Sequence, residues 1–261
     1  MGLDRVRAVL ARLGLAFACP IVTVTGTNGK GSTSAMLEAA MRSAGYRTGL
    51  YLSPHLVRYN ERVRIEGREV PDDALVGAFG EVEDARTALD PPVPLTYFEF
   101  GTLAAFLLFA RSAPDVLILE VGLGGRLDAV NAVDADVAIV TSVDLDHQDY
   151  LGGTREAIGR EKAGIFRPGR VAICGDPDPP ASVLEEAARV GATLYVAGRD
   201  FAATPEGTQW RYRGPGGERY GLPHPALRGA YQLGNAACAI AAGRRKTARS
   251  RLAPARPRRD R

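Results

Sequence analysis

Short apolar runs alternate with longer amphipathic stretches along most of the chain. The runs at 21–25, 115–121 and 136–143 are rich in β-branched residues and leucine, which is typical of parallel strands covered on both faces. Elsewhere apolar residues recur at helical spacing, as at Val6 and Val9. The alternation predicts an α/β domain with a mostly parallel sheet flanked by helices.

The same pattern, together with the glycine and proline positions, gives the order of the remaining elements. It predicts helices at 3–13, 33–44, 72–89, 97–110, 155–166 and 181–190, and a last helix from Tyr231 to Ala242. Further strands are expected at 48–52, 170–174 and 193–196. Two hairpins are expected. One has strands at 61–65 and 69–70 around the turn Glu66–Arg68, and the other has strands at 208–212 and 218–222 around the glycines at 214, 216 and 217.

Charge is distributed unevenly along the chain. The 261 residues contain 33 Lys and Arg against 30 Asp and Glu, yet residues 244–261 alone hold nine basic side chains and one acidic one. Removing that segment leaves 24 basic against 29 acidic side chains, so the basic balance does not indicate that the remainder binds nucleic acid. We expect residues 1–243 to form the folded domain and 244–261 to be a disordered basic tail.

The spacing of the cysteines and the length of the apolar runs exclude further classes of protein. Cys19, Cys174 and Cys238 are an odd number at wide spacing, which fits neither a disulfide framework nor a zinc site and favours the cytoplasm. The longest strongly apolar run, Leu103–Ala110, is too short to cross a bilayer. We therefore expect a cytoplasmic protein without a membrane partner.

The segment Ile21–Ser34 combines a buried strand, a glycine-rich turn and the start of a helix. Backbone N–H groups in such a turn form a nest for phosphate oxygens, and the N-terminus of the helix faces the same charge. Lys30 supplies a cation for the terminal phosphates, and Ser32 or Thr33 supplies a hydroxyl for magnesium. The segment predicts an ATP site formed by Gly26, Thr27, Asn28, Gly29, Lys30, Gly31, Ser32 and Thr33.

The loop does not follow the GxxxxGK[ST] spacing, because only two residues separate Gly26 from Gly29. The alternative interpretation is a glycine-rich strand-to-helix turn without a ligand, which the lysine and the hydroxyls together disfavour. TGTNGKGS resembles the nucleotide loop of the Mur ligase superfamily, whose members join amino acids to carboxylates at the expense of ATP. The resemblance implies a Mur-ligase-like phosphate-loop ATPase domain.

Polar side chains follow three of the expected strands. Ser53 comes after the second strand, Glu120 lies at the end of DVLILEV, and His147 follows DVAIVTSV and two aspartates. Ligands bind at the carboxyl ends of strands in open parallel sheets, and Mg²⁺ prefers oxygen ligands. These residues predict a magnesium site beside the phosphate loop. The alternatives are a solvated strand-end charge for Glu120 and a packed core histidine for His147.

Several longer motifs carry a more specific resemblance. They are SPHLVRYNERVRI at 53–65, TYFEF at 96–100, EVGLGGRLDAVN at 120–131, SVDLDHQDYLG at 142–152 and REKAGIFRPG at 160–169. In this order they resemble the folylpolyglutamate synthase and dihydrofolate synthase family of the Mur ligase superfamily. The resemblance extends from the first helix to about Ala242.

The resemblance implies roles for individual charged residues of this sequence. Ser53, Glu120 and His147 match the family's magnesium ligands. Lys162 matches a lysine that family members carry as a carbamate, an anionic ligand for a second Mg²⁺; without the resemblance, a surface lysine paired with a neighbouring glutamate is the better interpretation. The expected catalytic residues are therefore Lys30, Glu120, His147 and Lys162, with Ser53, Glu120, His147 and Lys162 as the expected metal ligands.

The resemblance also implies contacts with nucleotide and substrate. Asn235, in the last predicted helix, matches an asparagine that contacts the nucleotide. Thr96, Tyr97, Phe98, Glu99 and Arg126 fall where the family contacts its pterin substrate. Without the resemblance, the aromatic pair Tyr97 and Phe98 would indicate side chains that pack a helix against the rest of the domain.

The implied reaction forms an amide between the carboxylate of dihydropteroate or a folate and the amino group of L-glutamate, with ATP and Mg²⁺, through an acyl phosphate. The alternatives are a phosphate-loop kinase and a nucleotide-binding module without chemistry. Family members carry a second, smaller domain after the helix of Asn235, which we expect this chain to lack. A further alternative is therefore a nucleotide-binding fragment of such a ligase that is inactive or needs a partner. We expect a monomer that acts on small molecules and not on nucleic acid.

Overall fold

The computed structural model of the chain describes residues 2–229 and 231–243; the expected tail at 244–261 lies outside them. The main sheet contains β1 (Ile21–Thr25), β2 (Thr48–Tyr51), β3 (Val63–Ile65), β4 (Arg68–Glu69), β5 (Val116–Glu120), β6 (Val137–Val140), β7 (Val171–Cys174) and β8 (Thr193–Val196). A second sheet contains β9 (Ala202–Glu206), β10 (Gln209–Gly214) and β11 (Gly217–Pro223).

Eight α-helices and two short 3-10 turns accompany the strands in the described residues. The helices are α1 (Asp4–Arg12), α2 (Lys30–Ser43), α3 (Asp72–Thr87), α4 (Tyr97–Ser112), α5 (Gln148–Leu151), α6 (Arg155–Ala163), α7 (Ala181–Val190) and α8 (Gln232–Ala242). The 3-10 turns are η1 (Tyr59–Arg62) and η2 (Ala129–Ala132). Across residues 2–229 and 231–243, no helix has the length and apolar character needed to cross a membrane.

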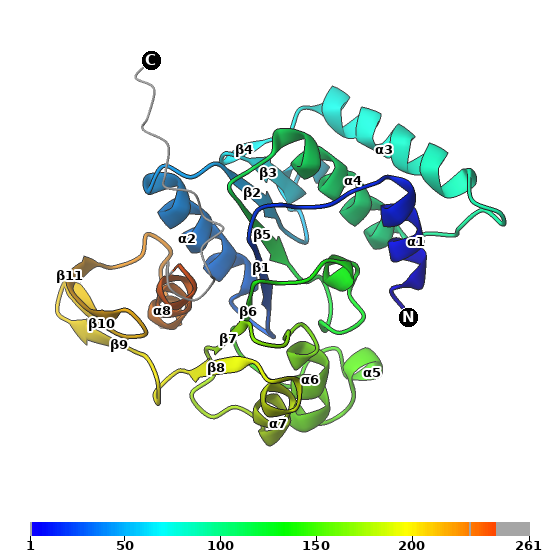
Figure 1. Ribbon diagram of the computed structural model, residues 1–261. Helices are drawn as coiled ribbons and strands as arrows, with labels where there is room; N and C mark the ends of the chain where they lie inside the picture. Colours follow the sequence, from blue (N-terminus) through cyan, green and yellow to red (C-terminus); the bar gives the residue numbers. More distant parts are fainter. Residues whose placement is uncertain (1, 230, 244–261) are drawn as a thin grey trace, which may run out of the picture.

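The main sheet has the strand order β4-β3-β2-β5-β1-β6-β7-β8 (Figure 1). Its six strands from β2 to β8 run parallel, and β3 and β4 are added as antiparallel strands at one edge. The mostly parallel α/β architecture expected from the sequence is confirmed.

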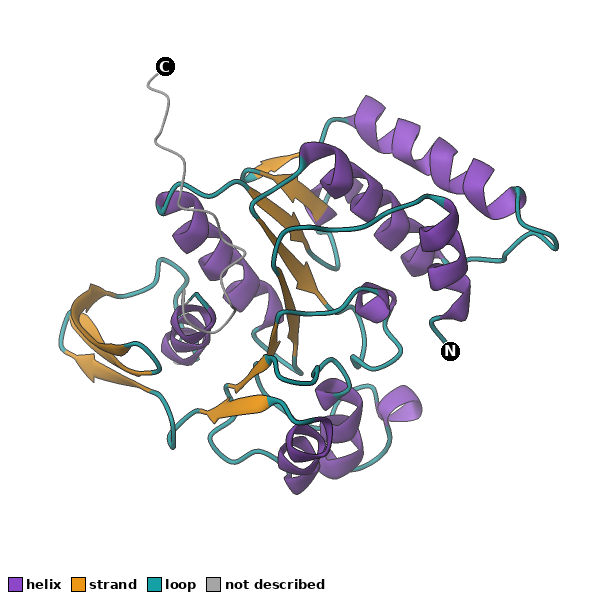
Figure 2. Cartoon of the chain, in the orientation of Figure 1, coloured by secondary structure: helices purple, strands orange, loops and turns teal. Residues whose placement is uncertain are grey.

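Helices cover both faces of this sheet and enclose two separate cores (Figure 2). In β5, Leu117 and Leu119 belong to the core that includes residues of α1, α3, α4, α6 and α7. Ile118 points the other way, into the core formed with α2, α8 and the second sheet. Because strands buried on both faces need apolar residues at every position, the run DVLILEV is continuous rather than alternating.

The central strand β1 positions the site. It lies between β5 and β6, with Val24 opposite Glu120 on one side and Thr25 opposite Val140 on the other. The carboxyl ends of these three strands therefore lie side by side. The loop that follows Thr25 begins next to Glu120 and next to the segment after β6.

Two elements begin two or more residues away from the predicted start. The helix predicted from Thr33 begins at Lys30, because the left-handed backbone of Gly29 is followed at once by helical residues. The strand predicted from Glu61 begins at Val63, because Glu61 and its neighbours form η1. The Glu61 carboxylate accepts hydrogen bonds from three backbone N–H groups, those of residues 56, 57 and 58, which stabilises the turn.

The second predicted hairpin has a third strand, β9, which the sequence pattern did not indicate. Its residues, AATPE, include no large apolar side chain, and Pro205 disfavours a strand. β9 pairs only with β10 and is an edge strand, where a proline is tolerated.

Candidate active site

The backbone of the loop between β1 and α2 depends on two glycines. Gly26 has φ +153° and Gly29, the residue before α2, has φ +84°. A Cβ atom on Gly26 would collide with Thr141 Oγ1, and one on Gly29 would collide with Asn235 Oδ1. The first turn of α2 carries no acidic side chain. The loop thus exposes an uncompensated helix N-terminus at the carboxyl end of the sheet, a place that favours anions.

Lys30 and Ser32, in the first turn of α2, contact this loop and the last helix. Lys30 Nζ donates hydrogen bonds to the carbonyl oxygens of Gly26 at 2.9 Å and Thr27 at 3.2 Å. Ser32 Oγ accepts from Gln232 Nε2 on α8 at 3.4 Å, and Gln232 Oε1 in turn accepts from Asn235 Nδ2 at 3.0 Å. The predicted nucleotide contact Asn235 therefore lies against the phosphate loop.

Glu120 ends β5 as a buried carboxylate, with 4% of the residue exposed. Its Oε2 accepts the backbone N–H of Ser53 at 2.9 Å, and Gly31 faces its Oε1. Burial raises the pKa of Glu120 to about 7, against the opposing effects of the Ser53 N–H and the charge of Lys30. Within the described ranges Glu120 forms no ion pair, and the charge of Lys30 offsets only part of the cost of burying its carboxylate.

Lys162 is a second buried charge near the loop. It lies on α6 with 3% of the residue exposed, and its Nζ has no hydrogen bond or ion pair with any residue of 2–229 and 231–243. Burial, reinforced by the charge of Lys30, lowers the pKa of Lys162 to about 8, and Asp146 opposes this shift. The interpretation as a paired surface lysine is therefore wrong for this structure.

A small cavity brings three of the four predicted catalytic residues together. Lys30, His147 and Lys162 line it, with Asp146 and the glycine-rich segment 121–124 that follows Glu120. His147 has φ +49°, its side chain is 57% exposed, and its Nε2 lies 3.6 Å from Asp146 Oδ2. His147 is therefore not a packed core histidine.

The predicted metal ligands come from four different elements around this cavity. In the described part of the chain, no cluster of three or more His, Cys, Asp or Glu side chains is arranged to hold a metal ion. The predicted set contains only two residues of these types, Glu120 and His147. Its other members are Ser53, whose backbone contacts Glu120, and Lys162, which lines the cavity.

Three of the predicted substrate residues, Thr96, Glu99 and Arg126, form hydrogen bonds or ion pairs within the protein. Thr96 and Glu99 form a capping box at the start of α4, and Arg5 binds the second carboxylate oxygen of Glu99 at 3.0 Å. Arg126 forms an ion pair with Glu161 at 2.7 Å. Both carboxylate oxygens of Glu99 thus have partners within the protein.

The two predicted aromatic contacts, Tyr97 and Phe98, have different surroundings at the start of α4. The ring of Phe98 lies close to Gly122, where a Cβ would come within 2.7 Å of it. Tyr97 is 65% exposed and lines a cavity of about 300 Å³ with aromatic walls, which include Tyr59, Phe79 and Phe100. Phe98 is therefore next to the glycine-rich segment of the small cavity, and Tyr97 faces a separate apolar space.

Comparison with known proteins identifies the family. Residues 24–243, most of the chain, match the Mur ligase middle domain. The chain belongs to this family. The dihydrofolate synthase/folylpolyglutamate synthase of Escherichia coli is 50% identical over 243 residues, which are 93% of this chain and 56% of that protein. The folylpolyglutamate synthase of Lacticaseibacillus casei is 36% identical, over 84% of this chain and 53% of that protein.

Solved structures of Mur ligase relatives agree with the fold. E. coli FolC in complex with DHPP and ADP has a TM-score of 0.88 and 47% identity, covering 95% of this chain and 59% of that one. A bifunctional folylpolyglutamate synthase/dihydrofolate synthase with Mn, AMPPNP and L-glutamate bound has a TM-score of 0.85 and 48% identity, covering 93% of this chain and 57% of that one. The chain thus spans less than two thirds of these relatives' length, and the resemblance found in the motifs is confirmed.

Two residues at this Mur ligase site were not predicted. Asp128 is a buried carboxylate whose oxygens accept the N–H groups of residues 122, 123 and 130; burial raises its pKa to about 6. It fixes the segment after Glu120, and an aspartate before a short turn is the signal that could have found it. Gln232, which links Ser32 to Asn235, had no signal, because its partner is 200 residues away.

Proposed function

We propose that this chain carries the nucleotide- and acceptor-binding part of an ATP-dependent ligase, which joins a pteroate or folate carboxylate to L-glutamate. The observation that carries the proposal is the convergence of two buried charges, Glu120 and Lys162, with Lys30 beside the glycine-rich loop, none of them in an ion pair within the described residues. Buried charges of this kind are costly unless a ligand compensates them. ATP with a divalent cation provides charges of both signs.

The triphosphate of ATP would be bound by the backbone N–H groups and side chains of the loop. The proposed contacts are Gly26, Thr27, Asn28, Gly29, Lys30, Gly31, Ser32 and Thr33, with Asn235 from α8. Left-handed glycines and the open N-terminus of α2 support this assignment. Lys30 Nζ donates to two carbonyl oxygens of this loop and would turn from them to the terminal phosphate.

Ser53, Glu120 and His147 would hold Mg²⁺. The donor set fits the ion, because Glu120 is a buried carboxylate with a raised pKa and no cationic partner among the described residues. When bound, Mg²⁺ neutralises negative charge on the phosphoryl oxygens. Ser53 also acts through its N–H, which orients the Glu120 carboxylate.

Lys162 is proposed to carry a carbamate. Its burial, its pKa of about 8 and the lack of an anionic partner in the described chain favour the neutral amine, which attacks CO₂ and releases a proton. The product is an anionic oxygen ligand at the same position. In ¹³CO₂-saturated buffer the chain should show a carbamate ¹³C resonance that Lys162→Arg removes; a spectrum unchanged by this variant would exclude the modification.

The acceptor would bind on the side of α4. Phe98, beside Gly122, and the aromatic cavity at Tyr97 support contacts with a flat ring system. Thr96 and Glu99 would act mainly by holding the start of α4 in place, since their polar atoms already bind each other and Arg5. Arg126 would contact the substrate only after exchanging its partner Glu161.

In the proposed reaction the acceptor carboxylate attacks the γ-phosphorus of ATP, and ADP leaves. The amino group of glutamate then attacks the acyl phosphate and releases inorganic phosphate. Lys30 offsets the charge on the transferred group, so the chain contributes positioning and electrostatics rather than a covalent intermediate.

The direct test is release of ADP by the purified chain with dihydropteroate or tetrahydrofolate as acceptor. The proposal requires that ADP release depend on both the acceptor and L-glutamate, with an amide product detected by mass spectrometry. Phosphate transfer to the acceptor without need for glutamate would favour a kinase. Tight ATP binding with no turnover would favour a nucleotide-binding module. We further propose a cytoplasmic monomer without affinity for nucleic acid, which sedimentation with and without added RNA can test.

A further inference from the structure

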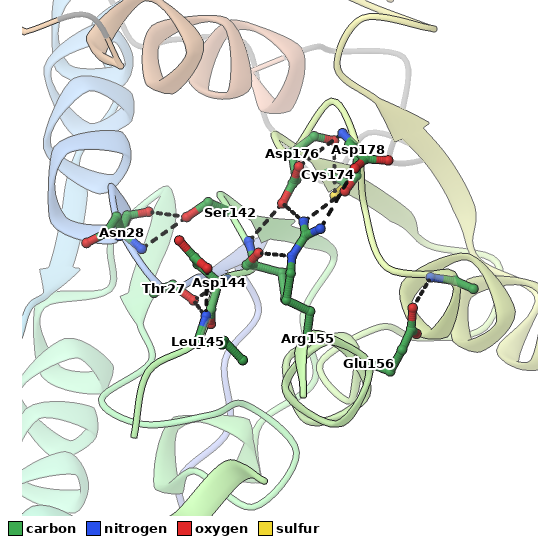
Figure 3. Close-up of polar contacts among 12 residues, drawn as sticks. Thr27, Asn28, Ser142, Asp144, Leu145, Arg155, Glu156, Cys174, Asp176 and Asp178 are labelled. Atoms are coloured by element: carbon green, nitrogen blue, oxygen red, sulfur yellow. Dashed lines mark hydrogen bonds and ion pairs between the residues drawn. The ribbon is translucent and has the colours of Figure 1, made fainter. Parts of the chain in front are cut away.

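We propose that Arg155 and Asp176 are positioning residues for the phosphate loop. They hold the segment that follows β6, and this segment in turn sets the geometry of the loop. The inference rests on the proposed nucleotide site, but neither Arg155 and Asp176 nor the segment that they hold is among the residues assigned to that site. It concerns three consecutive residues, Ser142, Val143 and Asp144, that connect β6 to the loop of His147 (Figure 3).

The first and third of these residues bind the phosphate loop. Ser142 O accepts the N–H of Thr27 at 2.9 Å, and Ser142 Oγ accepts the N–H of Asn28 at 3.1 Å. The hydroxyl of Thr27 accepts the N–H of Asp144 at 2.9 Å. Figure 3 shows the contacts of the Ser142 hydroxyl with Asn28 and of the Thr27 hydroxyl with Asp144. The position of Thr27 and Asn28 is thus fixed mainly by the segment after β6.

The middle residue, Val143, faces the other way, as alternate residues of an extended chain do. It is buried, with 2% exposed, and both of its backbone polar groups bind one ion pair. Its N–H donates to Asp176 Oδ2 at 3.0 Å, and its carbonyl oxygen accepts from Arg155 Nε at 2.9 Å. Arg155 and Asp176 also bind each other at 3.0 Å, which closes a ring around the Val143 peptide groups.

This ring connects three elements of the site. Arg155 is the first residue of α6, the helix that carries Lys162, and Asp176 follows β7. A buried peptide group without a hydrogen-bond partner destabilises the folded chain. The segment 142–144 would therefore have to shift if either Arg155 or Asp176 were removed. Because residues 142 and 144 bind Thr27 and Asn28, the shift would reach the phosphate loop.

The chain offers matched controls for both residues. Asp178 also lies within 3.8 Å of Arg155, but its side chain is 98% exposed and has no contact with Val143. Arg160 lies on the same helix and pairs at 3.6 Å with the exposed Glu185. Asp176→Asn is therefore compared with Asp178→Asn, and Arg155→Ala with Arg160→Ala. Arg155→Lys keeps the charge but cannot bind Val143 and Asp176 through one rigid fork.

The first measurement is amide hydrogen exchange of the ligand-free chain, which does not depend on any activity. Arg155→Ala and Asp176→Asn should each speed exchange at Thr27 and Asn28 by about tenfold or more, while both controls stay at the wild-type rate. Arg155→Lys should give an intermediate rate. Unchanged exchange at Thr27 and Asn28 in Arg155→Ala and Asp176→Asn overturns the inference, as does an equal change in Asp178→Asn.

The second measurement is the dissociation constant for ADP by calorimetry. We expect it to rise about tenfold in Arg155→Ala and Asp176→Asn and by less than about twofold in the controls. Equal ADP affinity in all five proteins overturns the inference. If the wild-type chain failed to bind ADP, the proposed function would fail, and the exchange experiment would still decide the role of Arg155 and Asp176.

Discussion

The two ends of the parallel sheet differ in how their charged side chains are paired. At the amino end, Asp115 precedes β5 and binds the backbone N–H and guanidinium of Arg47, both at 2.9 Å. Asp136 precedes β6 and binds the N–H of Ile21 at 3.0 Å and Arg170 at 2.8 Å. Each carboxylate there has a cation and a backbone donor within the protein.

At the carboxyl end, Glu120, Lys30 and Lys162 approach one another without forming an ion pair in the described residues. Glu120 and Lys162 are more deeply buried than the pairs at the amino end, and the pKa of each is shifted toward its neutral form by desolvation. This contrast indicates that a ligand binds at the carboxyl end. Charges that serve the fold are neutralised inside the chain, and charges that serve a ligand are left for the ligand to neutralise.

The largest expected effect is on catalysis at the carboxyl end. Lys30→Ala should lower glutamate-dependent ATP turnover by about 10²–10³-fold, because it removes a cation from the transferred phosphoryl group. Arg170→Ala, the matched cation at the amino end, should change turnover by less than about twofold. Steady-state ADP release measures both. Similar losses in the two variants would remove the functional distinction between the ends.

A smaller effect is expected when Glu120, at the same end, is changed, and it concerns the free energy of unfolding. The pKa of Glu120 is about 7 in the folded chain and 4.5 in its ordinary state, so the folded chain binds more protons between these values. Stability should therefore fall as pH rises from about 4.5 to 7, and the penalty should be complete above pH 7. Glu120→Gln removes the penalty and should stabilise the metal-free chain at pH 8 by up to about 3 kcal/mol.

Urea unfolding at pH 5 and pH 8 tests this prediction. The gain from Glu120→Gln should be larger at pH 8 than at pH 5, and Mg²⁺ with nucleotide should reduce it by stabilising the wild type. An equal gain at both pH values would mean that the Glu120 carboxylate carries no desolvation penalty.

The smallest expected effect is at the amino end. Arg47→Ala removes a half-exposed pair with Asp115 and should lower the free energy of unfolding by about 1 kcal/mol. The ADP dissociation constant should stay within about twofold of the wild type. Thermal unfolding and calorimetry measure the two quantities. Loss of ADP affinity with little loss of stability would show that this pair also serves the ligand.

The features of the fold and the site that depend on a local sequence pattern could be predicted from the sequence. The β-branched run before Gly26 predicted a buried parallel strand, and the pattern after the loop predicted the start of the helix to within three residues. Glu120 was found because a carboxylate at the end of a continuous apolar run has few purely structural explanations.

Other parts depend on contacts that no local pattern encodes. The ring of Arg155 and Asp176 around Val143 joins residues 12 to 33 positions apart, and each looks like an ordinary surface charge in sequence. β9 has too few apolar residues to be recognised before its partner β10 is in place. For Glu99, the capping role is visible in the TYFE spacing, but the ion pair with Arg5 appears only when α1 packs against α4.

The most direct test of the central claim is a crystal structure of the chain with AMPPNP and Mn²⁺, using the anomalous signal of the metal. We expect a triphosphate along residues 26–33, Lys30 turned onto its terminal phosphate, and an anomalous peak within coordination distance of Glu120. Nucleotide or metal bound elsewhere, with Glu120 and Lys162 still unpaired, would contradict it.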